Sequence, residues 1–419
     1  MKIKIIRKTY EEVVALPQKP RKKPQRPNVF FRTLVRLLSC KDLIPTGFKC
    51  DKADMKRAGR GPYLILMNHS CFLDMEIASG IFYPMPYGIV ATTDAFVGKD
   101  WLMRQLGCIE TQKFISDLKL IRDMDYMLKK KKTSVSMFPE AGYSFDGTAT
   151  VLPRKLGVLL KKLDVPVVHI QTWGAFARQP LYNLLKLRKV QVTAEMTCLL
   201  TREQVREMTV QQLDDAVNVA FSFDQFAWQR DNRVAVTEPD RAEGLERVLY
   251  KCPVCGAEGQ LQGTGTELHC RCGAKWQLDE YGQLQGEKNP HPHIPDWNRW
   301  QREEVRREIE AGRYGLDVPV EIGLLRDTGA LYMVGEGRLT HSAEGFRLTG
   351  CDGRLDYSQG PRASHTVNCD FYWYQIADVI GLGNRECRYF CFPKTPVPVA
   401  KVRLAAEELY KISKKHVDL

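Results

Sequence analysis

Between residues 62 and 235 the chain alternates short apolar runs with longer, charged stretches of helical character. Apolar runs bounded by turn residues predict buried strands, and strands that alternate with helices predict a parallel sheet covered by those helices. The predicted strands are 63–67, 87–92, 134–138, 165–172 and 189–196, and 115–131 is a predicted helix. This region is therefore predicted to be an α/β domain with a mostly parallel sheet.

The remaining sequence predicts further domains, because 419 residues are too many for one ordinary hydrophobic core. After the cysteine-bearing segment and a helical linker, short alternating runs from 318 to 392 predict a small β-rich domain closed by a helix at 400–414. In outline this last domain resembles a pleckstrin-homology-like fold, which is an analogy of fold alone. The predicted segments are a basic arm with an amphipathic helix (1–45), the α/β domain (46–248), a ribbon (249–287), and the linker with the β-rich domain (288–419).

The formal net charge of +12 favours an anionic partner, either nucleic acid or a lipid surface. The first ten residues lack the apolar core of a secretory signal, so the thirteen cysteines are expected in a reducing cytoplasm. No stretch reaches the ~18 uncharged apolar residues of a membrane span. If the protein meets a membrane, we expect it to lie on the surface.

The N-terminal segment carries features of such a surface contact. Residues 17–28 hold three Lys and two Arg among four prolines, which predicts an extended basic arm. Residues 30–38 place aromatic and aliphatic side chains at helical spacing, with Arg32 and Arg36 between them. The helix either packs on its own domain or lies in a membrane interface, and the adjacent basic arm favours the interface. We therefore expect a peripheral protein on the cytoplasmic face of an anionic membrane.

The chemistry begins where the first predicted strand ends, at Asn68, His69 and Asp74. On one regular helix His69 and Asp74 would point about 140° apart, so they meet only if His69 lies in the strand-to-helix turn. There the carboxylate can orient the ring, and the second ring nitrogen can act as general base towards a substrate hydroxyl. Taken alone, a histidine near an aspartate is more often structural, so this assignment depends on the neighbouring motifs.

Three further segments add polar groups near strand ends. The strand at 134–138 runs into Phe138-Pro139-Glu140-Ala141-Gly142-Tyr143-Ser144, which places a carboxylate and a glycine turn where α/β folds build their sites. Lys113 follows the glycine turn of Leu106-Gly107-Cys108-Ile109-Glu110-Thr111-Gln112. Asp164-Val165-Pro166-Val167-Val168 begins another apolar strand. Each segment is weak evidence alone, but the order and spacing together are strong evidence.

These four segments resemble the four blocks of the glycerolipid acyltransferase family, the 1-acylglycerol-3-phosphate acyltransferases and their relatives, over roughly residues 60–200. The resemblance implies that His69 is the general base and Asp74 its partner. It also implies that Glu140 and Gly142 belong to the acceptor-binding turn and that Lys113 faces the acceptor head group.

Two positions depart from the family pattern. The family usually has Arg where this chain has Lys113, and its third block reads F-P-E-G-T-R-S, so Tyr143 stands as the substrate-binding residue in place of an Arg. Lysine cannot make the bidentate phosphate contact of arginine, and tyrosine carries no charge. Arg154 either supplies the missing substrate contact or belongs to an ordinary solvated helix start.

Closely spaced cysteines predict a metal site. Cys252 and Cys255 have the C-x2-C spacing of a zinc knuckle, and Cys270 and Cys272 follow after a glycine-rich loop. The second pair is one residue shorter than usual, so His269 with Cys272 is an alternative half-site. Structural zinc is the predicted metal, and a metal-free pair of reduced hairpins is the alternative.

Two functions follow from these patterns. The first is an acyltransferase that moves a fatty acyl group from acyl-CoA or acyl-carrier protein to a lysophospholipid hydroxyl. The second is a zinc-ribbon nucleic-acid-binding or other non-enzymatic interaction protein. The ribbon carries few basic residues and no aromatic-interleaved basic stripe. We therefore expect lipid and thioester partners and no nucleic acid.

Overall fold

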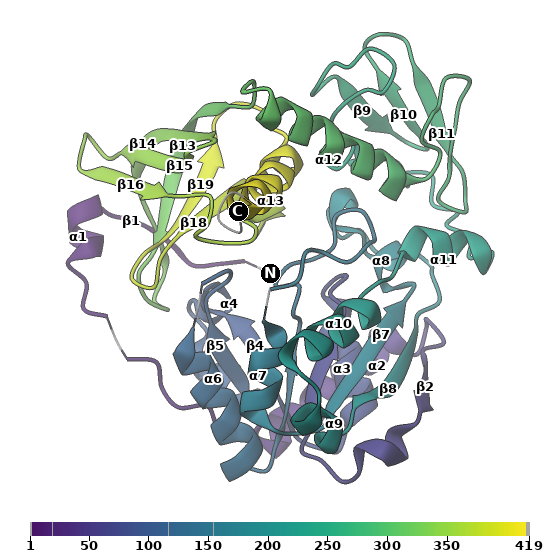
Figure 1. Ribbon diagram of the computed structural model, residues 1–419, viewed down its shortest axis with the longest axis vertical. Coiled ribbons are helices and arrows are strands. Elements are labelled where there is room, and N and C mark those ends of the chain that lie inside the picture. The colour runs from purple at the N-terminus through teal and green to yellow at the C-terminus, as the bar shows by residue number, and fades with distance from the viewer. Residues whose placement is uncertain (1, 19, 116, 154, 416–419) are drawn as a thin grey trace.

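The computed structural model describes residues 2–18, 20–115, 117–153 and 155–415. A seven-stranded sheet forms the lower lobe of Figure 1. Its parallel core is the order β7-β3-β6-β4-β5, and β8 lies antiparallel to β7 with β2 parallel to β8 at the edge. These strands are β2 (Lys49–Ala53), β3 (Leu64–Met67), β4 (Tyr87–Thr92), β5 (Cys108–Thr111), β6 (Ser134–Met137), β7 (Val167–Trp173) and β8 (Thr193–Leu200). The mostly parallel sheet is confirmed.

Helices cover both faces of this sheet, which is why β3 is apolar throughout. Leu64 and Leu66 pack in one cluster with α6, α7 and α10, whereas Ile65 and Met67 pack in another with α3. Alternate residues of a strand point to opposite faces, so a strand covered on both sides reads as a continuous apolar run. The helices of this part are α2 (Val29–Leu43), α3 (Leu73–Phe82), α4 (Thr93–Phe96), α5 (Asp100–Gln105), α6 (Leu118–Asp125), α7 (Leu156–Leu163), α8 (Ala175–Arg178), α9 (Arg202–Glu207), α10 (Val210–Ala220) and α11 (Gln225–Asp231).

The C-terminal part is an antiparallel sheet in the order β16-β15-β14-β13-β19-β18-β17. This arrangement confirms the β-rich C-terminal region, and Figure 1 shows it as the upper lobe around α13. The elements are α12 (Ile294–Glu310), β13 (Leu316–Leu325), β14 (Leu331–Ser342), β15 (Gly345–Gly350), β16 (Leu355–Gln359), β17 (Asn368–Trp373), β18 (Ala377–Gly383), β19 (Arg388–Pro393) and α13 (Val399–Lys415).

The cysteine-bearing segment forms a four-stranded antiparallel sheet, β9 (Leu261–Thr264), β10 (Glu267–Cys270), β11 (Lys275–Leu278) and β12 (Leu284–Gln285). Trp276 of β11 packs edge-on against Trp297 of α12, with ring centroids 4.9 Å apart, and both rings are buried. This small sheet therefore shares its core with the linker helix.

The first residues of the chain pack on the C-terminal sheet. Strand β1 (Ile5–Arg7) pairs in parallel with β14, and α1 (Tyr10–Val14) follows it. The described residues of the basic arm after α1 form neither helix nor strand, and some of their charges bind other parts of the protein. Arg21 makes two hydrogen bonds of 2.6 Å to the Asp117 carboxylate, and Lys22 pairs with Asp100.

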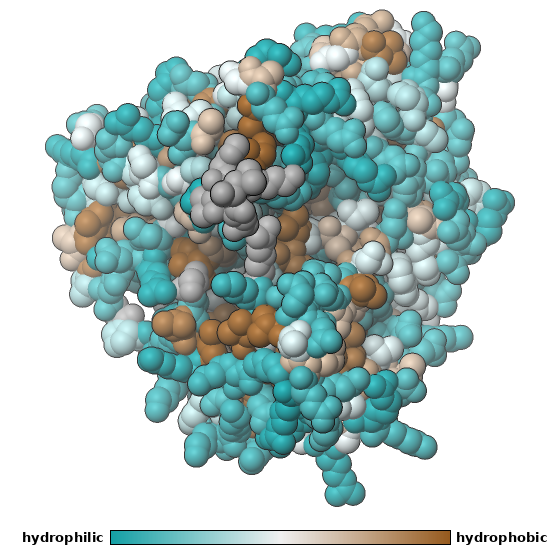
Figure 2. Space-filling model, viewed as in Figure 1, coloured by the Kyte–Doolittle hydropathy of each residue, from teal (hydrophilic) through white to brown (hydrophobic). Residues whose placement is uncertain are grey.

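Apolar surface residues gather where the lobes meet in the view of Figure 2, while the outer surface is mostly hydrophilic. Among the described residues, no helix has both the length and the apolar character required to cross a bilayer.

Candidate active site

His69 and Asp74 meet at the carboxyl end of β3. The chain leaves the strand at Asn68, turns, and enters α3, so Asp74 lies in the first helical turn. His69 Nδ1 is 3.0 Å from Asp74 Oδ2, which also accepts hydrogen bonds from the backbone N–H groups of Ser70 (2.7 Å) and Cys71 (3.0 Å). A neutral ring that donates its Nδ1 proton to this carboxylate presents Nε2 as an acceptor.

The surroundings of the His69 ring favour its neutral form. The ring stacks on Phe138 with centroids 4.0 Å apart and lies 4.4 Å from the Tyr143 ring. Burial lowers the pKa of His69, and the Asp74 carboxylate opposes this effect only in part. The side chain keeps 19% of its surface exposed. The lowered pKa favours the unprotonated ring at neutral pH.

Glu140 connects the two loops of the site. Its carboxylate accepts hydrogen bonds from the His69 backbone N–H (2.7 Å) and the Thr150 backbone N–H (3.0 Å), and the Ser144 N–H donates to the His69 carbonyl oxygen. Burial raises the pKa of Glu140 to about 8, although both backbone donors lower it. Because β3 and β6 are adjacent parallel strands, this carboxylate holds the His69 turn against the loop that follows β6.

The turn after Glu140 leaves space beside its glycine. The residue with left-handed backbone is Ala141 (φ 55°), and no atom lies within 4 Å of the position that a Cβ on Gly142 would occupy. The Tyr143 ring packs against the His69 ring. No arginine side chain stands at this position. Arg154 lies outside the described residues.

Lys113 contacts the C-terminal sheet, which the sequence did not predict. Its Nζ donates to Asn368 Oδ1 on β17 at 3.3 Å. The Asp370 carboxyl, on the same strand, has its pKa raised to about 6 by burial, with the Lys113 charge acting against this rise. Nearby, Phe145 stacks on Phe371 with centroids 4.4 Å apart. The C-terminal sheet therefore forms one wall of the candidate site.

The four predicted cysteine ligands lie together in the second candidate site. Their sulfur atoms are all within 4.8 Å of one another, and Cys252 is 3.9 Å from Cys272 while Cys255 is 3.8 Å from Cys270. Sulfurs about 3.8 Å apart are what a tetrahedral ion with bonds of about 2.3 Å requires. This group of candidate ligands contains Cys270 and not His269, the alternative that the sequence left open. These thiols could hold a metal ion.

Comparisons with known proteins find similarity over part of the chain. Residues 47–172 match the model of the Acyltransferase family. A solved structure of the 1-acyl-sn-glycerophosphate acyltransferase from Thermotoga maritima matches with a TM-score of 0.32 and 15% sequence identity, covering 46% of this chain and 79% of that one. Comparison with curated proteins gave no match.

Proposed function

We propose that this chain, which carries a domain of the Acyltransferase family at residues 47–172, moves a fatty acyl group from a thioester to the hydroxyl of a lysophospholipid such as 1-acylglycerol-3-phosphate. The observation that carries the proposal is the His69–Asp74 pair, with Nδ1 bound to the carboxylate and a partly exposed ring. The donor is acyl-CoA or acyl-carrier protein.

In this mechanism His69 Nε2 takes the proton of the acceptor hydroxyl as its oxygen attacks the thioester carbonyl carbon. The carbon–sulfur bond then breaks, and the proton passes to the departing thiolate, so no acyl-enzyme forms. The backbone N–H groups of Gly142 and Tyr143 make no hydrogen bond within the described part of the chain. We propose that they stabilise the oxyanion of the tetrahedral intermediate.

The direct test is transfer of labelled acyl groups from acyl-CoA and from acyl-carrier protein to a panel of lysolipids. Product that forms only with a thioester donor and a hydroxyl-bearing acceptor would support the proposal. Absence of transfer from both donors to every acceptor would contradict it and return the interaction-protein hypothesis to the front.

The pH dependence provides a second test. The pKa of His69 is lowered by burial, so the ring stays neutral to lower pH and the acid limb of kcat/KM should have its midpoint below the ordinary histidine pKa of about 6.5. Asp74 raises this pKa, so in Asp74→Asn the acid limb of the residual activity should move to still lower pH. A pH–rate profile of both proteins measures this shift, and an acid limb above 6.5 would contradict the assignment.

We propose that α2 binds a membrane surface. Several of its apolar side chains are exposed, among them Phe30 at 67% and Leu37 at 64%. The Phe31 ring meets the exposed Trp101 ring edge-on, with ring centroids 5.4 Å apart. An apolar helix face beside basic residues suits an anionic interface. Because Arg21 is bound to Asp117, we expect fewer charges of the arm to contribute than its composition indicates.

Membrane binding should depend on these apolar side chains. Phe30→Glu and Leu37→Glu should each weaken binding to vesicles about tenfold or more, since an inserted apolar side chain contributes about 1.5–3 kcal/mol. Val219→Glu, at an exposed apolar position on α10, is the matched control. Vesicle co-sedimentation measures the difference, and equal binding of all three variants would place the membrane contact elsewhere.

We also propose that the metal is structural zinc, held by Cys252, Cys255, Cys270 and Cys272 in a zinc ribbon. The sulfur spacing supports this ligand set. For the C-terminal part, the strand order and the closing helix α13 support the pleckstrin-homology-like interpretation.

A further inference from the structure

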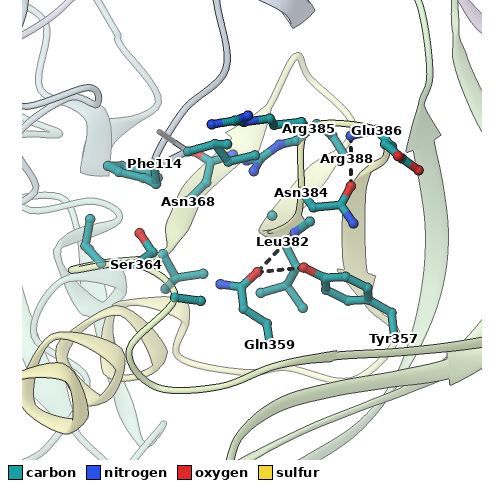
Figure 3. A pocket seen from close by; sticks show the side chains of 16 residues that line it. Phe114, Tyr357, Gln359, Ser364, Asn368, Leu382, Asn384, Arg385, Glu386 and Arg388 are labelled. Carbon is teal, nitrogen blue, oxygen red and sulfur yellow. Dashed lines mark hydrogen bonds between the residues drawn. The ribbon is translucent and has the colours of Figure 1, made fainter. Parts of the chain in front are cut away.

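A pocket of about 480 Å³ lies between the C-terminal sheet and the loop after β5. Figure 3 shows Phe114 and Asn368 on one side, Tyr357 and Gln359 on another, and Arg388 with its side chain directed along the edge near Asn368. Asn368 also accepts the hydrogen bond from Lys113. The positive charge of Lys113 is close enough to His69 to help lower the pKa of that ring. The pocket therefore borders the candidate active site.

The amide side chains of the pocket present donors. Gln359 Oε1 accepts from the Tyr357 hydroxyl and from the Gly383 N–H, both at 3.2 Å. Asn384 Oδ1 accepts from the N–H groups of Glu386 and Cys387, and Asn368 Oδ1 accepts from Lys113. Gln359 Oε1 and Asn384 Oδ1 each accept two hydrogen bonds, and Asn368 Oδ1 accepts one from a cation, so the N–H groups of the three amides are the groups most available to a ligand. A lining of N–H donors favours an anion.

Arg388 adds a positive charge that the described protein does not pair. Its residue surface is 7% exposed, and its guanidinium makes no hydrogen bond or ion pair with any described residue. Burial lowers its pKa to about 10, with Asp94 opposing this effect, so it remains protonated at neutral pH. A buried guanidinium without a bound carboxylate is costly unless another anion meets it. Among the described residues that line the pocket, Glu386 is the one with a carboxylate, and it is exposed and turns away from Arg388 in Figure 3.

We propose that this pocket binds a phosphate ester of one substrate, through Arg388 and the amide N–H groups of Gln359, Asn368 and Asn384. The inference rests on the proposed acyl transfer only for the identity of that substrate. The phosphate belongs either to the head group of the acceptor lipid or to the carrier of the thioester donor. In both cases the C-terminal sheet supplies the phosphate contact that Lys113 and Tyr143 supply poorly.

The test uses unreactive probes, so that it does not depend on catalysis. Glycerol 3-phosphate represents the acceptor and CoA represents the donor carrier, and titration calorimetry on the full chain measures their affinity. Arg388→Met should weaken binding of at least one probe about tenfold or more, the usual loss for a charged hydrogen bond. Ala363→Trp, which fills the exposed rim of the pocket, should have the same effect without removing the buried arginine.

Arg338→Met is the matched control, because Arg338 lies on β14 of the same sheet and pairs with Asp317 in an exposed position. Loss of glycerol 3-phosphate binding assigns the pocket to the acceptor, and loss of CoA binding alone assigns it to the donor. Probes that fail to bind, or that bind the Arg388 and Ala363 variants as tightly as the unaltered protein, would overturn the inference even if acyl transfer is observed. If the unaltered protein binds a probe but shows no transferase activity, and these variants lose that binding, the phosphate pocket would be supported and the proposed acyl transfer would be contradicted.

Discussion

Replacing His69 with alanine should lower kcat/KM for acyl transfer about 10²- to 10⁴-fold, the usual contribution of a general base. The ring is the only described group that combines contact with Asp74, a pKa lowered by burial, and partial exposure at the end of β3. Its loss removes the acceptor for the hydroxyl proton. Initial rates with labelled acyl-CoA or acyl-carrier protein measure the effect.

A matched control separates catalysis from folding. His291 stacks on Trp300 with centroids 5.5 Å apart, outside the candidate site, so His291→Ala removes a similar ring contact and should keep full activity. If a folded His69→Ala variant transferred acyl groups at the rate of the unaltered protein, the proposed mechanism would be wrong.

Asp74→Asn should lower turnover and keep the fold, for a reason visible in the hydrogen bonds. All three donors, the His69 ring and the N–H groups of Ser70 and Cys71, meet the same oxygen, Oδ2. An asparagine carbonyl in that position can keep the three bonds, so the substitution removes the negative charge and leaves the geometry. The variant should therefore fold normally while turnover falls, because the imidazolium formed during proton transfer loses its stabilising charge.

The parts of the fold that sequence predicted best are those with a strong local pattern. Strands 87–92 and 134–138 were predicted within one residue, because apolar runs bounded by turn residues are unambiguous. The strand predicted at 189–196 forms at Thr193–Leu200, since its own apolar run continues past the predicted end. Strand β2 was missed because its residues are mostly charged and exposed at a sheet edge.

For the candidate site, the sequence predicted the polar residues of the loops after β3 and β6. It did not predict that the C-terminal sheet contributes to the site. His69, Asp74 and Glu140 follow strand ends, and adjacent parallel strands bring such residues together. Lys113 and Asn368 are 255 residues apart, and no local pattern relates them. Sequence also does not show that Arg388 makes no ion pair with a described residue, because this depends on which carboxylates the fold places within bonding distance.

The second large effect is expected at the cysteine cluster. The purified protein should contain about one zinc per chain, and Cys252→Ser should release it, because structural zinc contributes about 10–16 kcal/mol of apparent binding free energy that is coupled to folding. Cys252 is buried within the shared core, where Trp276 meets Trp297 of α12. Loss of zinc should therefore expose residues 250–286 and loosen the linker helix, while the α/β sheet keeps its own core.

Elemental analysis and hydrogen exchange measure these two consequences separately. Cys50→Ser is the matched control, because Cys50 lies on β2 outside the metal cluster and should leave both zinc content and exchange unchanged. Zinc in the control but not in Cys252→Ser, with faster exchange confined to the ribbon and α12, is the expected result. Protein purified without chelators that contains no zinc would end this assignment. Zinc retained in full by Cys252→Ser would show that the ion is held by other groups.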